Sequence, residues 1–101
     1  EDMPVLDVRT VGEYAAGHMP NSLNIPHTQL RNRLGEVRTW VEESVGDQPF
    51  VVMCAAGVRS WIGYRIVRHA GFNVTMLSGG IQTLRAWLGE KAEAVLVTGE
   101  R

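Results

Sequence analysis

The sequence contains a single cysteine, Cys54, among its 101 residues. An internal disulfide needs two cysteines, and the cysteine-rich zinc sites need several thiolates, so both are excluded. We therefore expect no metal site of that kind. Any thiol chemistry in this protein must belong to Cys54.

Neither an excess of one charge nor a long apolar run is present. Ten Lys and Arg residues against 11 Asp and Glu residues leave a formal net charge of −1, which gives no electrostatic reason to expect binding to nucleic acid or to anionic membranes. The longest apolar runs, such as residues 49–56, fall far short of the roughly 20 residues that a membrane span needs. The N-terminus shows no signal-peptide pattern, so we expect a cytoplasmic protein.

The overall composition is that of an ordinary globular domain. Hydrophobic residues make up 45% of the chain and charged residues 21%, which allows one modest core. A length of 101 residues suits one compact domain and leaves no room for two. We therefore predict a single domain over residues 1–101, without internal repeats.

Short apolar runs alternate with segments of helical periodicity along the chain. Apolar runs rich in β-branched residues, bounded by turn residues, indicate buried strands. Strands are expected over residues 4–8, 22–25, 49–53 and 73–77, with a further edge strand over 94–97. Helices are expected over residues 10–17, 28–35, 36–45, 60–70 and 81–88.

Local signals predict where these helices begin and end and which faces they bury. Thr10 is expected to cap the first helix, with Glu13 bonding back to the cap. Gly35 is expected to close or interrupt the second helix, and Gly71 to end the helix that follows Cys54. The apolar stripe of the third helix consists of Val37, Trp40, Val41 and Val45, which places Trp40 in the core. The stripe of the helix after Cys54 consists of Ile62, Ile66 and Val67.

Strands that alternate with helices in units of about 30 residues imply a parallel sheet with right-handed crossovers. The expected fold class is therefore α/β, a three-layer fold with a central parallel sheet and helices on both faces. In such sheets, functional sites form at the carboxyl ends of the strands. Cys54 directly follows the strand over residues 49–53, so the fold and the site predictions agree on one place.

Cys54 opens a Cys-x-x-Gly-x-Arg loop that leads from a strand into a helix. A tight turn ahead of a helix N-terminus aims backbone N–H groups inward and, together with the helix dipole, favours a negative charge. We therefore expect a lowered pKa for the Cys54 thiol. Gly57 gives the loop its backbone freedom, and Arg59 adds a planar cation for anionic oxygens or sulfur. The small side chains of Ala55 and Ala56 leave the sulfur unobstructed.

Two other interpretations of Cys54 stay open on the residues alone. Most lone cysteines are simply small buried residues, and the end of a strand suits that role. A Cys–His hydrolase would need a histidine from elsewhere in the chain, such as His18, because none lies near Cys54 in sequence. The glycine and arginine of the loop favour the reactive thiolate over both.

Four stretches of the chain resemble the rhodanese family, and the match spans about residues 5–88. Residues 6–14 are similar to the family's opening strand and helix, with Asp-Val-Arg followed by Glu. Residues 17–26 are similar to its Gly-His-Ile-Pro-Gly-Ala-x-Asn-Ile-Pro stretch. Residues 54–59 are similar to its active loop, and residues 77–80 to its late Gly-Gly turn. Four such stretches in the right order form a specific signal.

The resemblance implies an enzyme, a sulfurtransferase of the rhodanese type. Cys54 would attack thiosulfate or a persulfide, hold the outer sulfur as Cys–S–S⁻, and pass it to a thiol or to cyanide. The residues implied to bind the persulfide anion are Ala55, Ala56, Gly57, Val58 and Arg59. This chemistry needs no metal and no organic cofactor. Because Arg59 is the only charge in the loop, we expect weak recognition of dianionic thiosulfate and better use of small persulfides.

Asp7, Arg9, Glu13 and His18 match the framework positions of the family, and we predict structural roles for them. Arg9 and Glu13 lie four residues apart across a helix start, so they are expected to pair. His18 is expected to be a packed, hydrogen-bonded loop histidine. The other two histidines, His27 and His69, are expected at the surface.

Two alternative functions are weighed against sulfur transfer. Related phosphatases and arsenate reductases on this fold place five residues between Cys and Arg, whereas this loop has four and suits a single bound sulfur. A catalytically silent module for protein interaction or sensing is the other alternative. Silent members tend to lose the cysteine or the loop arginine, and this chain keeps Cys54 and Arg59.

The chain departs from the family pattern outside the catalytic loop. Asn21 stands where the family usually has Gly, and Asn tolerates a left-handed backbone, so the turn can survive. Leu84 stands where an aromatic residue is common, and Trp87 is expected to fill that space. The segment over residues 36–48 is longer than the usual link and is expected to form an extra surface helix.

The start of the chain and the sequence of two segments suggest that this domain is part of a longer protein. The family often has a strand and helix ahead of the Asp-Val-Arg strand, so either the domain was cut from a longer protein or the tail strand near Val95 takes that edge. Residues 25–34 and the aromatic Trp61 resemble rhodanese modules fused to flavin-dependent coenzyme A-disulfide or persulfide reductases. A fused or partner oxidoreductase is therefore an expected neighbour.

Overall fold

The computed structural model describes residues 4–55 and 58–76 of the chain. Its strands are β1 (Val5–Asp7), β2 (Ser22–Asn24), β3 (Phe50–Met53) and β4 (Val74–Met76). Its α-helices are α1 (Val11–Ala15), α2 (His27–Leu30), α3 (Leu34–Trp40) and α4 (Val58–His69). A 3₁₀ turn, η1 (Arg31–Arg33), and a π-helical turn, η2 (Val41–Val45), extend the α2–α3 segment. The expected elements over residues 81–88 and 94–97, with Leu84, Trp87 and Val95, lie outside the described residues.

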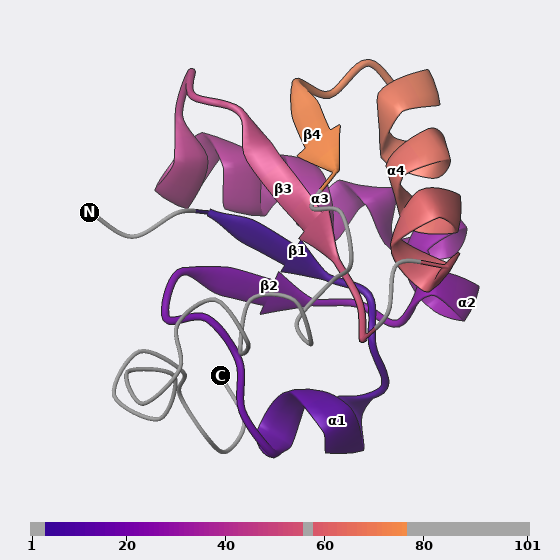
Figure 1. The fold of residues 1–101 in the computed structure, drawn as a ribbon. Helices are drawn as coiled ribbons and strands as arrows, with labels where there is room; N and C mark the ends of the chain where they lie inside the picture. Colours follow the sequence, from indigo (N-terminus) through magenta and orange to yellow (C-terminus); the bar gives the residue numbers. More distant parts are fainter. Residues whose placement is uncertain (1–3, 56–57, 77–101) are drawn as a thin grey trace.

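The four strands form one parallel sheet in the order β2-β1-β3-β4. The crossover through α1 leads to one edge of the sheet, and those through α2–α3 and α4 lead toward the other. Right-handed crossovers therefore place α1 on one face and α2, α3 and α4 on the other (Figure 1). The predicted α/β fold with helices on both faces of a parallel sheet is confirmed.

The hydrophobic core lies between the sheet and helices α2, α3 and α4. Successive residues of a strand point to opposite faces, so Leu6 and Val52 contribute to this core while Asp7 faces the α1 side. The indole of Trp40 packs edge-on against Phe50, with ring centroids 5.3 Å apart. Trp40 is only 4% exposed, which confirms its predicted place in the core.

The helical segment between β2 and β3 continues through Gly35, where the sequence predicted a helix end or an interruption. Gly35 lies inside α3 and does not close or interrupt a helix; the break falls earlier, at Arg33, whose φ of −124° departs from helical values. Gly35 stands in the first turn, where backbone N–H groups lack intrahelical partners anyway, so its flexibility costs little there. The extra helix predicted over residues 36–45 is present as α3 and η2, and Gly46 ends it with φ 72°.

Helix α4 buries Val67 and packs Ile66 against the core as predicted, but it leaves Ile62 exposed. Its buried residues are Ser60, Gly63 and Val67, whereas Ile62 is 42% exposed. The small residues allow the helix to approach the sheet closely, because a Cβ on Gly63 would lie 3.0 Å from the Val8 Cγ1 atom. The prediction from apolar residues alone was therefore wrong for Ile62. Gly71, with φ 98°, ends the helix as predicted.

The turn before β2 also differs from its prediction. Asn21 does not use the left-handed conformation considered for it, since no non-glycine residue in the described ranges has positive φ. Instead its carbonyl accepts a hydrogen bond of 2.9 Å from the Val5 N–H. The turn therefore joins the sheet edge without a special backbone conformation.

Gly63 and Gly35 form a matched pair for testing the close approach of α4. Gly63→Ala gains helix propensity of about 1 kcal/mol, but its methyl would crowd Val8 and Val52 at 3.0 and 3.2 Å. Overpacking of this kind costs about 1–3 kcal/mol, so we expect a net destabilisation near 1 kcal/mol. Gly35→Ala meets nothing within 4 Å and should be stabilising by about 0.5 kcal/mol. Urea unfolding measures both, and a Gly63→Ala variant as stable as Gly35→Ala would contradict the packing.

Candidate active site

The carboxyl ends of β1 and β3 meet beside Cys54. Asp7 is in register with Met53, and the Val8 N–H donates a 2.9 Å hydrogen bond to the Met53 carbonyl. Cys54 follows directly, and α4 begins at Val58 on the far side of its loop. The structure thus places the cysteine where parallel sheets form their sites.

Cys54 itself is buried, with 1% of its surface exposed. It belongs to the same hydrophobic cluster as Val8 and Val52. The sulfur is therefore less open than the small neighbours Ala55 and Ala56 suggested. Reactive cysteines are usually partly exposed, so this burial agrees equally with a packing role. Ala55 is half-buried, Val58 is 74% exposed, and Ala56 and Gly57 lie outside the described residues.

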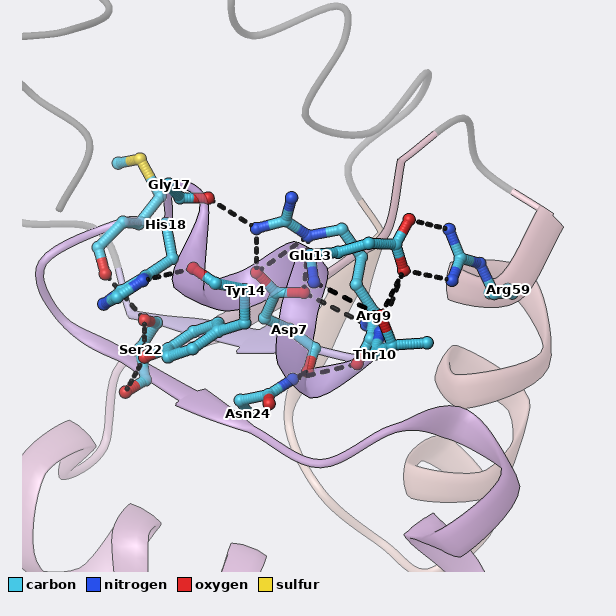
Figure 2. Close-up of polar contacts among 11 residues, drawn as sticks. Asp7, Arg9, Thr10, Glu13, Tyr14, Gly17, His18, Ser22, Asn24 and Arg59 are labelled. Carbon is cyan, nitrogen blue, oxygen red and sulfur yellow. Dashed lines mark hydrogen bonds and ion pairs between the residues drawn. The ribbon is translucent and has the colours of Figure 1, made fainter. Parts of the chain in front are cut away.

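A bidentate ion pair joins Arg59, on the first turn of α4, to Glu13 of α1. Arg59 Nη1 and Nη2 donate to Glu13 Oε1 and Oε2 at 2.6 and 2.9 Å (Figure 2). Glu13 also completes a capping box: its Oε1 accepts from the Thr10 N–H at 2.9 Å, and Thr10 Oγ1 accepts from the Glu13 N–H. The predicted cap is confirmed, and the same carboxylate fixes the direction of the Arg59 guanidinium.

The charges of this pair stabilise one another. The hydrogen bond from Arg59 lowers the pKa of Glu13 to about 2, with further help from Thr10 and against the effect of burial. The hydrogen bond to Glu13 raises the pKa of Arg59 above its ordinary value, and the charges of Cys54 and Asp7 add smaller contributions. A negative charge on Cys54 would therefore act on the pKa of Arg59 in the same direction as the charge of Glu13.

Arg9 pairs with Asp7, not with Glu13 as predicted. Arg9 Nε and Nη2 donate to Asp7 Oδ1 and Oδ2 at 3.0 and 2.8 Å, and Nη2 also donates to the Gly17 carbonyl at 2.7 Å. Asp7 is 0% and Arg9 4% exposed. Asp7 and Arg9 lie two residues apart at the end of a strand, so their side chains point to the same face of the sheet. The prediction instead used the spacing of four between Arg9 and Glu13, which applies only within a helix.

His18 is buried on the α1 side of the sheet. Its Nδ1 lies 2.7 Å from the Tyr14 carbonyl oxygen, and its ring stacks on that of Tyr14 with centroids 3.6 Å apart. The Tyr14 hydroxyl lies 2.7 Å from Ser22 Oγ, which donates to the Met19 carbonyl. Figure 2 shows this group set apart from Arg59 by the Asp7–Arg9 pair. The ring nitrogen thus faces the backbone of α1, as expected for a packed loop histidine. His69 is exposed and His27 half-buried.

Three polar residues that the sequence prediction missed, Asn24, Tyr14 and Ser22, also hold β1, β2 and α1 together. The Asn24 amide donates to the carbonyl oxygens of Asp7 and Arg9 at 2.9 and 3.0 Å, which ties β2 to the end of β1. Tyr14 and Ser22 link α1 to the start of β2. All three lie in the stretches 6–14 and 17–26 that resemble the family. A buried polar side chain needs a hydrogen-bond partner, so their place there could have indicated a structural role.

No group of three or more His, Cys, Asp and Glu residues within 4–55 and 58–76 is placed to hold a metal ion. Among the described helices, none combines the length and the apolar character needed to cross a membrane.

The site is that of an α/β domain with a cysteine at the carboxyl end of a central strand and an arginine at the start of the next helix. A family model of the rhodanese-like domain matches residues 1–86. The chain belongs to this family, as the sequence motifs implied.

Relatives show that the domain occurs in proteins of different activity. The HTH-type transcriptional regulator Rv0324 of Mycobacterium tuberculosis is 35% identical over 82 residues, which are 79% of this chain and 33% of that protein. The tRNA uridine(34) hydroxylase of Enterobacter sp. is 32% identical over 81 residues, 79% of this chain and 23% of that protein. This chain therefore spans a third or less of both relatives, and family membership alone does not fix the reaction.

A solved structure gives a further comparison. The NAD-dependent persulfide reductase from A. fulgidus is 39% identical, with a TM-score of 0.62 over 80% of this chain and 14% of that chain. The matching part is again a small share of a longer protein.

The ion pair with Arg59 can be tested with Glu13→Gln, which keeps an acceptor for the cap but loses the charge. Both partners are partly exposed, so the expected loss at pH 7 is below about 1 kcal/mol. The folded pKa of about 2 lies below the ordinary 4.5, so the contribution is complete above about pH 4.5 and is lost as the pH falls toward 2. Urea midpoints measured across this range should converge for wild type and variant. A gap that stays constant down to pH 2 would contradict the pair.

Proposed function

We propose that this domain is a sulfurtransferase in which Cys54 carries sulfane sulfur as a persulfide. The observation that carries the proposal is the placement of Cys54 and Arg59 at the two ends of the loop between β3 and α4, with the Arg59 guanidinium held by Glu13. A fixed cation next to a sulfur favours its anionic forms. Both the thiolate and the persulfide are such forms.

The reaction has two balanced steps. In the first, the Cys54 thiolate attacks the outer sulfur of a donor, so that a new S–S bond forms and the donor leaves with the electron pair of its broken bond. In the second, an acceptor thiolate or cyanide attacks the outer sulfur of Cys54–S–S⁻, and the Cys54 thiolate is released. No net oxidation is required, and no proton needs to be stored on the protein between the steps.

The pairing of Arg59 bears on which donor is used. Two of its N–H groups are already engaged by Glu13, so fewer remain for the oxygens of thiosulfate. The other described loop residues, Ala55 and Val58, carry no charge. We therefore extend the proposal to small persulfides as better donors than thiosulfate.

The proposed setting is a longer protein or complex that supplies the sulfur donor or the acceptor. The likeness to a persulfide reductase supports an oxidoreductase as the neighbour. The short coverage of the curated relatives supports the same view of this chain as one module among others.

A second candidate function is that of a silent interaction module, and one observation favours it. Cys54 is 1% exposed and lies within the hydrophobic cluster, as a packing residue would. The retained pair of Cys54 and Arg59 weighs against this alternative. Phosphatase chemistry is less well supported, because only four residues separate Cys54 from Arg59.

Intact-mass measurement after incubation with glutathione persulfide or thiosulfate tests the proposal directly. Wild type should gain the mass of one sulfur atom, and cyanide should remove it. Glutathione persulfide should load the protein at lower concentration than thiosulfate. Cys54→Ser should gain nothing, since the attacking thiolate is gone.

Folding of the Cys54→Ser variant is checked by circular dichroism, because a hydroxyl replaces a buried thiol. Wild-type protein that gains no sulfur from either donor would refute sulfur transfer and leave the interaction module. A gain that persists in a folded Cys54→Ser variant would place the sulfur elsewhere.

A further inference from the structure

Helix α4 presents an exposed stripe that begins beside the Cys54 loop. Val58, Trp61 and Ile62 are 74%, 50% and 42% exposed. Their spacing of three and four residues puts them on one face of the helix, and Arg65 and His69 continue that face toward its end. Isolated apolar residues at a surface are ordinary, but a contiguous run of large ones marks an interaction site.

The part of this stripe from Trp61 to His69 forms one wall of a groove. Arg31 and Leu34, from the segment between β2 and β3, form the opposite wall, and the groove encloses about 500 Å³. Figure 1 shows α2 and α4 side by side, with α4 rising away from the Cys54 loop. The groove therefore lies along the helix that also carries Arg59.

Both charged side chains among the described residues that line the groove are arginines, Arg31 and Arg65. No carboxylate of residues 4–55 and 58–76 lines it. No ion pair within the described residues engages Arg31 or Arg65. The Arg65 guanidinium lies 6.0 Å from the centre of the Trp61 ring, so a cation is held over an aromatic surface. The formal net charge of the whole chain is −1, whereas the described charges that line the groove are both positive.

We propose that this groove docks an acidic amphipathic segment of a partner protein, bound as a helix. An apolar face of the partner would cover Trp61, Ile62 and Leu34, while its flanking carboxylates would meet Arg31 and Arg65. The 12 residues of α4 span about 18 Å at 1.5 Å per residue, enough for about three turns of a partner helix.

The same combination of arginine and tryptophan occurs in proteins that bind single-stranded nucleic acid. Two features favour a protein partner here. Leu34, Ile62 and Ile66 contribute apolar lining without aromatic platforms for successive bases, and the chain has no overall positive charge.

A partner helix that extends beyond Trp61 along the stripe would reach Val58, at the end of α4 nearest the Cys54 loop. Only this consequence, the delivery of a thiol to Cys54, rests on the proposed sulfur transfer. The binding itself does not, so the two are tested separately.

Fluorescence anisotropy with a labelled peptide tests the docking. The probe is a helical peptide of about 12 residues with Leu on one face and Glu at the flanking positions; its match has Lys in place of Glu. Wild type should bind the Glu peptide and bind the Lys peptide at least about tenfold more weakly. The double variant Arg31→Glu, Arg65→Glu should lose at least about tenfold in affinity for the Glu peptide and gain affinity for the Lys peptide.

Arg68→Glu is the matched control, because Arg68 is exposed on the same helix but does not line the groove. Its affinity should stay within about twofold of wild type. Cys54→Ser should bind the Glu peptide normally, whatever the outcome of the sulfur-loading experiment. Absence of binding to the Glu peptide, an equal loss in Arg68→Glu, or tighter binding of a single-stranded RNA oligonucleotide that displaces the peptide would each overturn the proposal.

Discussion

The ion pair between Glu13 and Arg59 is the contact on which the geometry of this site depends. It joins residues 46 positions apart, one on the first helix and one at the start of the helix after the cysteine. Without this ion pair, the long Arg59 side chain would sample many rotamers, and fixing its charge in one place would cost conformational entropy. With it, the direction of the guanidinium is fixed by the capping box at Thr10, which is itself a local property of the sequence. Local helix chemistry thereby positions a group that acts across the fold.

A second, buried pair supports the first. Asp7 and Arg9 are almost fully removed from water, and burying two charges is costly unless every lone pair and proton finds a partner. Here the carboxylate accepts from the Arg9 backbone and side chain, and the guanidinium also reaches the Gly17 carbonyl. These hydrogen bonds hold the end of β1 to Gly17, across the helix α1 that carries Glu13. Specific geometry, more than net stability, is what such a pair provides.

The fold and the position of Cys54 could be predicted from the sequence because both follow from local patterns: apolar runs, the Thr10–Glu13 cap and the strand-loop-helix order. The partners of charged side chains could not. Arg9 has two acids within four residues, Asp7 and Glu13, and only the strand geometry decides between them. The prediction for α4 was right for Val67 and wrong for Ile62, and it missed Ser60 and Gly63, which are buried by close approach and not by hydrophobicity. The roles assigned to Cys54 and the loop residues stay predictions.

The most direct measurement of the central claim is the rate of sulfur loading onto Cys54 as the Arg59 side chain is changed. Arg59→Lys keeps the positive charge but loses the bidentate hold of Glu13, and Arg68→Lys makes the same change on an exposed part of the same helix. With a persulfide donor in excess, the account predicts loading about tenfold slower in Arg59→Lys, which corresponds to about 1.4 kcal/mol, and an unchanged rate in Arg68→Lys. Equal rates in wild type and in both variants would contradict it.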